Sequence, residues 1–218
     1  MTTSQKLIRW SALAWLVSAL TGIFYTFFAP SDFAQNVMRS GLWMPTHAAL
    51  AVSYMLFVFG LIGVHLKQAE KAGWLGSTGF VLSFFSIIIL TAQLIVSAWI
   101  LPALAAQAGM PKTAAGLLDP SGSLAAFSTV VYLVYIPTVI GLILLGISIM
   151  RAGVLPRWAG LLLIIGTLLD LAVLIGAPGE MIVKAGDLIF DAGKLWIVYT
   201  LWSATRTPVM LAQAKPAH

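Results

Sequence analysis

Long apolar runs separated by short polar segments dominate the chain. The runs continue for about 20 residues, the length that an α-helix needs to cross a hydrocarbon layer roughly 30 Å thick. Strands of a membrane barrel would instead alternate polar and apolar residues over about ten positions. The pattern therefore predicts membrane-spanning helices. Six runs qualify: Ile8–Phe28, Thr46–Leu66, Trp74–Ala103, Ala125–Met150, Trp158–Gly176 and Met181–Ser203.

The composition supports a membrane environment for the whole chain. Of the 218 residues, 60% are hydrophobic and only 9% are charged, whereas a soluble domain carries about 25% charged residues. Such an exterior suits lipid, in which only helices and closed barrels satisfy their own backbone hydrogen bonds. We therefore expect one integral membrane domain, residues 1–218, of the all-α class. The absence of cysteine excludes disulfides and thiol chemistry.

Basic residues gather on one side of the predicted helices. One side holds eight of them, namely Lys6, Arg9, Lys67, Lys71, Arg151, Arg157, Arg206 and Lys215. The opposite side has only Arg39 and Lys112. Because cytoplasmic loops carry the excess of Lys and Arg, we predict a bundle of three antiparallel hairpins with both termini in the cytoplasm. Trp10, Trp74 and Trp158 are then expected at the inner interface, where indole rings gather.

The last predicted helix carries four ionisable residues on one stripe. Lys184, Asp187, Asp191 and Lys194 follow one another at spacings of three, four and three, an arc of roughly 80° on a helix. A charge in the centre of a membrane helix costs about 2.5–3.5 kcal/mol, so the stripe is predicted to face the bundle interior or a wet cavity. The helical rise also places Asp170, on the preceding helix, level with Asp191 and Lys194.

Two interpretations of this stripe remain open. In the first, Lys184 pairs with Asp187 and Lys194 with Asp191, Asp170 is a third acid, and the network only fixes helix packing. In the second, the stripe is a polar path that ends in a site binding a small polar solute or a proton. Three acids then outnumber two lysines, a balance that suits proton exchange.

Other side chains are weaker candidates. His47, at the outer start of the second helix, either joins the mouth of such a path or is an ordinary interfacial residue. Tyr132, Tyr135 and Pro137 on the fourth helix could line a cavity at a kink, but plain core is the favoured interpretation of such aromatic residues. His65 is about 27 Å from His47 along the helix, so these two histidines cannot ligate one haem. No metal-ligand cluster is apparent, and we expect neither a metal nor a cofactor.

The motifs favour no enzyme class. The chain has no phosphate-binding glycine loop, nucleophile elbow or nucleic-acid motif. A carrier-like protein that binds a polar solute or proton at the Asp/Lys cluster is the leading hypothesis, with the lipid bilayer as its partner. The alternative is an accessory or structural subunit of a larger membrane complex, or a homo-oligomer whose stripe faces a partner chain. A lipid-directed enzyme using two acids is a third possibility that no motif selects.

Several stretches resemble a group of uncharacterised bacterial six-span membrane proteins that contain a domain of unknown function. They are GLIGVHLKQAEKAGWLGSTGFVLS at 60–83, ILPALA at 100–105, RAGVLPRWAGLLLIIGTLL at 151–169 and LIFDAGKLWIVYTLW at 188–202. The resemblance implies a bacterial cytoplasmic membrane and no known activity. The final helix of that group is usually less charged, so the stripe departs from its pattern and takes no function from it.

Overall fold

The structure is a computed structural model that describes residues 3–30, 40–106, 125–171 and 180–204. Within these ranges the regular elements are all helical, so the predicted all-α class is confirmed. The elements are α1 (Thr3–Phe28), α3 (Trp43–Ile95), the π-helical turn η1 (Val96–Ile100), α4 (Leu101–Ala106), α6 (Ala125–Ala152), α7 (Arg157–Asp170) and α8 (Glu180–Ala204).

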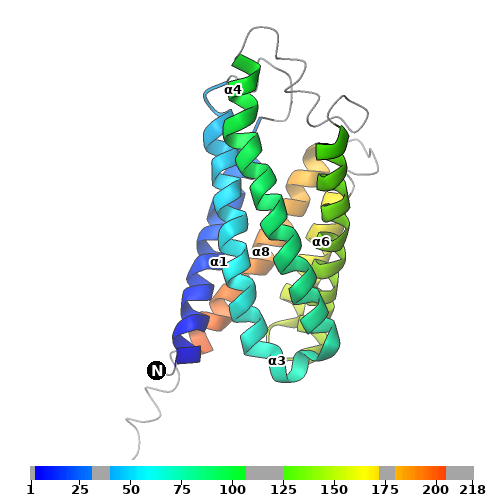
Figure 1. The fold of residues 1–218 in the computed structure, drawn as a ribbon. Coiled ribbons are helices and arrows are strands. Elements are labelled where there is room, and N and C mark those ends of the chain that lie inside the picture. The colour runs from blue at the N-terminus through cyan, green and yellow to red at the C-terminus, as the bar shows by residue number, and fades with distance from the viewer. Residues whose placement is uncertain (1–2, 31–39, 107–124, 172–179, 205–218) are drawn as a thin grey trace, which may run out of the picture.

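Helix α3 consists of two arms that meet at Gly73. This residue has φ 59° and ψ −163°, a conformation that glycine adopts without the steric cost paid by other residues. From this bend the arms run back along each other in opposite directions (Figure 1). The second and third predicted helices are thus joined without a loop. Residues 67–72, expected to connect them, are helical because Lys, Gln, Ala and Glu are good helix formers.

The helices close into a ring around a common core. Helix α1 packs against α3 and α8, α3 against α6, α6 against α7, and α7 against α8, so that the first and last helices are neighbours (Figure 1). Fully buried side chains from around this ring meet in the middle of the bundle, among them Trp15, Leu61, Leu145, Leu163 and Ile197.

The contact between α1 and the first arm of α3 is especially close. A Cβ atom added to Gly60 would lie only 1.5 Å from Cδ1 of Trp15, so the indole ring occupies the space of a side chain. The same ring stacks on Phe57 at 5.0 Å, and its Nε1 donates a hydrogen bond of 2.8 Å to the Phe57 carbonyl. Shape and hydrogen bonding together therefore fix the register of these two helices.

Within the described ranges, three helical stretches are long and apolar enough to cross a membrane, which supports a transmembrane protein. They are Thr3–Phe28, Trp43–Leu104 and Leu133–Ala152, and the second includes both arms of α3. Helix α7 spans only 14 residues in the described part of the chain. Helix α8 is long enough but contains the four ionisable residues of the predicted stripe.

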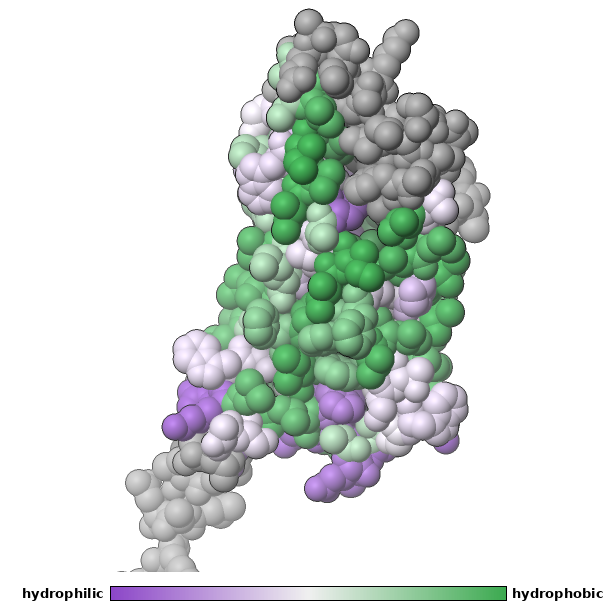
Figure 2. Space-filling view, viewed as in Figure 1, coloured by the Kyte–Doolittle hydropathy of each residue, from purple (hydrophilic) through white to green (hydrophobic). Residues whose placement is uncertain are grey.

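Polarity separates along the axis of the bundle. Hydrophobic residues cover its middle, and hydrophilic residues gather at the end where α1 begins (Figure 2). The elements at this end supply Lys6, Arg9, Lys67, Lys71, Arg151 and Arg157. Trp10, Trp74 and Trp158 also lie there and expose 70%, 72% and 55% of their surface. These indole rings therefore point away from the core, as interfacial rings do.

The element boundaries agree with the predicted ones to different degrees. Helices α6 and α8 agree to within two residues, whereas α1 begins at Thr3, five residues before the predicted start. The third predicted helix continues through η1 and α4 to Ala106, beyond its expected end at Ala103. The predicted end of the fifth helix and the basic residues Arg39, Lys112, Arg206 and Lys215 lie outside the described residues.

Candidate functional site

A cavity of about 310 Å³ lies inside the bundle. Residues from the last part of α1 and the first part of α8 line it, so it lies nearer the end opposite to the basic residues. Every helical segment of the ring contributes to its wall. One lining residue from each shows this: Tyr25 of α1, Tyr54 and Leu90 of the two arms of α3, Tyr135 of α6, Asp170 of α7 and Asp187 of α8. The cavity is therefore a product of the whole fold and of no single hairpin.

A buried ion pair lies at one side of the cavity. Asp191 and Lys194 are each only 4% exposed, and Nζ of Lys194 lies 2.5 Å from Oδ1 of Asp191. The ammonium also donates to the Ser18 hydroxyl at 3.2 Å, and it lies 5.5 Å and 5.4 Å from the ring centroids of Phe57 and Phe190. One carboxylate, one hydroxyl and two aromatic faces thus replace the water around this charge.

Small residues of α1 make room for this pair. A Cβ atom at Gly22 would lie 2.8 Å from Oδ2 of Asp191, so only glycine allows the carboxylate to approach this closely. One turn away, the Ser53 hydroxyl donates to the Ser18 carbonyl at 2.7 Å and lies 3.2 Å from the Ser18 hydroxyl. The polar chain from Lys194 through Ser18 to Ser53 links α8, α1 and the first arm of α3.

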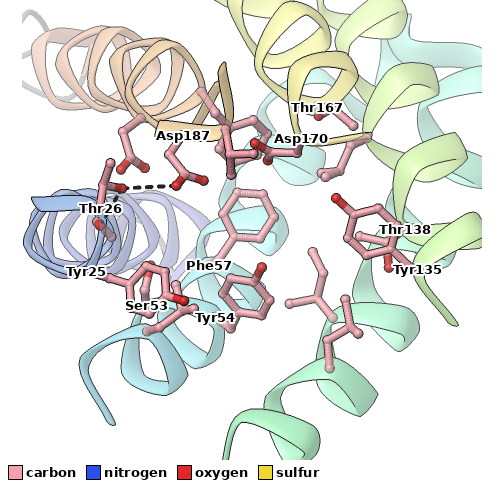
Figure 3. A pocket seen from close by; sticks show the side chains of 18 of the residues that line it. Tyr25, Thr26, Ser53, Tyr54, Phe57, Tyr135, Thr138, Thr167, Asp170 and Asp187 are labelled. Atoms are coloured by element: carbon pink, nitrogen blue, oxygen red, sulfur yellow. Dashed lines mark hydrogen bonds between the residues drawn. The ribbon is translucent and has the colours of Figure 1, made fainter. Parts of the chain in front are cut away.

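The second acid of α8 also contacts α1. The Thr26 hydroxyl lies 3.2 Å from Oδ2 of Asp187 and 3.1 Å from the Gly22 carbonyl, and it can donate to either oxygen (Figure 3). Asp187 also lines the cavity. The two acids of α8 are therefore both anchored near the same stretch of α1.

Asp170 is the third acid of the cavity, and its Oδ1 is buried without a hydrogen-bond partner in the described part of the chain. A Cβ atom at Gly186 would lie 2.7 Å from this oxygen. Asp170 is thus level with Gly186, which lies five residues or about 7 Å before Asp191. Its predicted level with Asp191 and Lys194 is wrong, because counting from the basic ends ignores how α7 and α8 are offset.

The acids and the phenols occupy different sides of the cavity. Asp170 and Asp187 lie together along one side, and Tyr25, Tyr54 and Tyr135 lie across from them (Figure 3). Sequence analysis favoured plain core for Tyr135, and the structure instead places it on the cavity wall, whereas Pro137 is not among the described lining residues.

Three of the predicted site residues, His47, Lys184 and Lys194, are not among the described residues of the cavity wall, and of these Lys194 contacts the lining acid Asp191. His47 is buried, stacks on Trp43 at 4.0 Å and has its Nδ1 2.9 Å from the Trp43 carbonyl. Its ring meets the ring of Tyr25 edge-on at 5.5 Å, so one aromatic side chain separates it from the cavity. Lys184 is half-buried on α8 and is not among the described lining residues. The structure therefore assembles Asp170, Asp187, Asp191 and Lys194, without His47 and Lys184.

Sequence analysis passed over most of the polar partners. These are hydroxyl-bearing residues on the four helices other than α8 that line the cavity: Ser18, Tyr25, Thr26, Ser53, Tyr54, Thr138 and Thr167. A signal for some of them was present, because Ser18, Gly22 and Thr26 repeat every fourth residue of α1 and so share one face. That face could be read as ordinary close packing of small residues, and the sequence alone did not link it to α8.

The arrangement is suited to binding protons or cations in the interior of the bundle. Among the described residues no group of three or more His, Asp or Glu could hold a metal ion, so the acids surround the cavity without converging on one point. Fold and cavity together define a helical membrane protein with an internal acidic chamber. Comparisons of the chain with protein-family models, curated proteins and solved structures find no match.

Proposed function

We propose that the chain crosses the membrane six times with both termini in the cytoplasm. The two arms of α3 supply two crossings, and the charged face of α8 turns toward the cavity, which removes the main obstacle to its insertion. The end of the bundle with Lys6, Arg9 and Lys71 would be cytoplasmic, since basic residues favour that side. The resemblance to bacterial six-span proteins supports a bacterial cytoplasmic membrane.

On this topology, we infer that the protein is carrier-like and binds a small polar solute or a proton in the cavity. The observation that carries the proposal is the shared wall: six helical segments enclose one chamber that three carboxyl groups line. Ionisable residues are costly inside a membrane and mark solute or proton paths there. A purely structural ion pair would require Asp191 and Lys194 only. That interpretation does not explain why Asp170 and Asp187 also line the cavity.

Flux through reconstituted liposomes tests this function. The purified chain would be assayed for proton entry with a trapped pH-sensitive dye, and for uptake of labelled ethanolamine, glycine and glucose, which are a cation, a zwitterion and a neutral solute. We expect flux of a proton or of at least one solute, and at least a tenfold loss in Asp170→Asn. This substitution keeps the shape of the side chain and breaks no ion pair in the described part of the chain.

Glu70→Gln is the matched control, because it also neutralises one acid but lies exposed near the bend of α3. It should leave flux unchanged. Wild-type-like flux in Asp170→Asn and in Asp191→Asn, with both proteins folded, would contradict the proposal. Absence of all flux, together with a stoichiometric partner retained after mild extraction, would favour the accessory-subunit alternative.

A further inference from the structure

The hydroxyl groups that line the cavity leave it rich in acceptors and poor in donors. Ser53, Thr138 and Thr167 each donate their proton to a helix carbonyl, at 2.7, 2.9 and 2.8 Å. The proton of Thr26 is committed to Asp187 or to a backbone carbonyl. These oxygens can therefore only accept from a ligand. Among the described lining residues, the remaining hydroxyl donors are the three phenols.

The charged side chains that line the cavity also favour a ligand that donates hydrogen bonds and carries positive charge. Three carboxyl groups line it, and no Lys, Arg or His is among its described lining residues. Among the three acids, Lys194 makes its direct contact with Asp191. Asp170 and Asp187 therefore face the cavity without a lysine or arginine contact in the described part of the chain, and the buried Oδ1 of Asp170 lacks any donor. A group that brings positive charge and N–H donors would satisfy both.

Lys194 shows how this interior holds an ammonium group. Its Nζ is surrounded by the carboxylate of Asp191, one hydroxyl and the faces of Phe57 and Phe190. Across the cavity the same combination recurs without a lysine: the carboxyl groups of Asp170 and Asp187 lie opposite three phenol rings (Figure 3). Carboxylates with aromatic faces are the chemistry that recognises organic cations.

We propose that the cavity binds a small organic ammonium ion that retains N–H donors, held between Asp170, Asp187 and the phenol rings. The inference rests on the proposed function and narrows its solute to one class. The volume of about 310 Å³ is at the lower end for ligand pockets, so it suits a compact amine. Carboxylate-bearing and zwitterionic solutes are disfavoured, because the described lining residues include no Lys, Arg or His to receive their negative end.

Binding to the full-length protein in detergent or nanodiscs, measured by titration calorimetry, tests the proposal with probes that share one ring. The probes are cyclohexylammonium, cyclohexyltrimethylammonium, cyclohexanol and cyclohexanecarboxylate. We expect cyclohexylammonium to bind most tightly and each of the others at least tenfold more weakly. The double variant Asp170→Asn/Asp187→Asn should weaken cyclohexylammonium binding about 10- to 100-fold, the range for hydrogen bonds to charged groups. Glu70→Gln should bind as the wild type does.

The outcomes separate this inference from the proposed function. Equal or tighter binding of the alcohol or the carboxylate would overturn the ammonium class but leave a polar-solute carrier in place. Proton flux without binding of any probe would overturn the inference and leave a proton path. If neither binding nor flux is seen, both fail. Should the double variant not fold, the single Asp170→Asn decides, since its Oδ1 has no hydrogen bond to lose: undiminished binding there also overturns the proposal.

Discussion

Removing either partner of the Asp191–Lys194 pair, or both, would measure how dry the site is. In Asp191→Asn the ammonium loses the negative charge that lies 2.5 Å away and keeps a neutral amide oxygen, the Ser18 hydroxyl and two ring faces. Breaking a buried ion pair on one side costs about 3–5 kcal/mol. We expect about 3 kcal/mol for Asp191→Asn, since some of the shell around the ammonium survives, and a similar loss for Lys194→Met.

The double variant Asp191→Asn/Lys194→Met should be far less damaging than the sum of its parts. It removes both charges and leaves one amide short of partners, which costs about 1–2 kcal/mol. The coupling free energy between the two positions is then about 4–5 kcal/mol, within the range measured for close charge pairs. The measurement is the free energy of unfolding of all four proteins in mixed micelles titrated with a denaturing detergent.

Additive losses below about 1 kcal/mol for each single variant would refute this reasoning. That result is typical of exposed ion pairs, and it would mean that water reaches the pair despite the 4% exposure of each residue. The conclusion that the Asp191–Lys194 pair is shielded from water would then fail as well.

Three glycine substitutions test the close contacts by the same unfolding measurement. Gly60→Ala places a Cβ 1.5 Å from Cδ1 of the buried Trp15 ring, and we expect a loss of about 3 kcal/mol. Gly73→Ala forces alanine into φ 59° and should cost about 1–2 kcal/mol. Gly22→Ala places a Cβ 2.8 Å from Oδ2 of Asp191; displacing that carboxylate should cost about 1–2 kcal/mol and weaken cyclohexylammonium binding.

Gly41→Ala is the control for all three, because a Cβ there meets nothing within 4 Å and its φ is not positive. Its unfolding free energy should stay within about 0.5 kcal/mol of the wild type. Losses of less than about 0.5 kcal/mol for Gly60→Ala or Gly22→Ala would show that the helices shift to accommodate the added Cβ. The close contacts would then not fix the positions of the helices.

The sequence predicted what depends on local periodicity. The lengths of the apolar runs predicted the all-helical class and the bounds of α6 and α8. The helical rotation of 100° per residue predicted the shared face of Asp187, Asp191 and Lys194. Sequence could not predict the offset of α7 against α8, which placed Asp170 beside Gly186 and Asp187. That offset depends on which side chains interlock between two helices, and run lengths carry no such information.

The sequence also could not predict which residues form the cavity wall, and the reason is physical. Tyr25, Tyr54 and Tyr135 come from three helices far apart in sequence, and an aromatic residue in an apolar run is indistinguishable from plain core until its neighbours are known. Lys184 shows the converse, because it belongs to the predicted stripe but does not line the cavity. A stripe that covers roughly 80° of the helix surface is wide enough for a residue at one edge, such as Lys184, to lie outside the cavity wall.

The contact between α1 and α8 has a consequence for assembly during synthesis. Lys194 needs Ser18, and Asp187 needs Thr26, yet about 160 to 180 residues are made between these partners. Until α8 is synthesised, the polar face of α1 lacks these hydrogen-bond partners. The charged face of α8 is in turn unstable in hydrocarbon until it packs against α1. The chamber is thus completed in a single late step, and a chain that ends before α8 should have no closed interior.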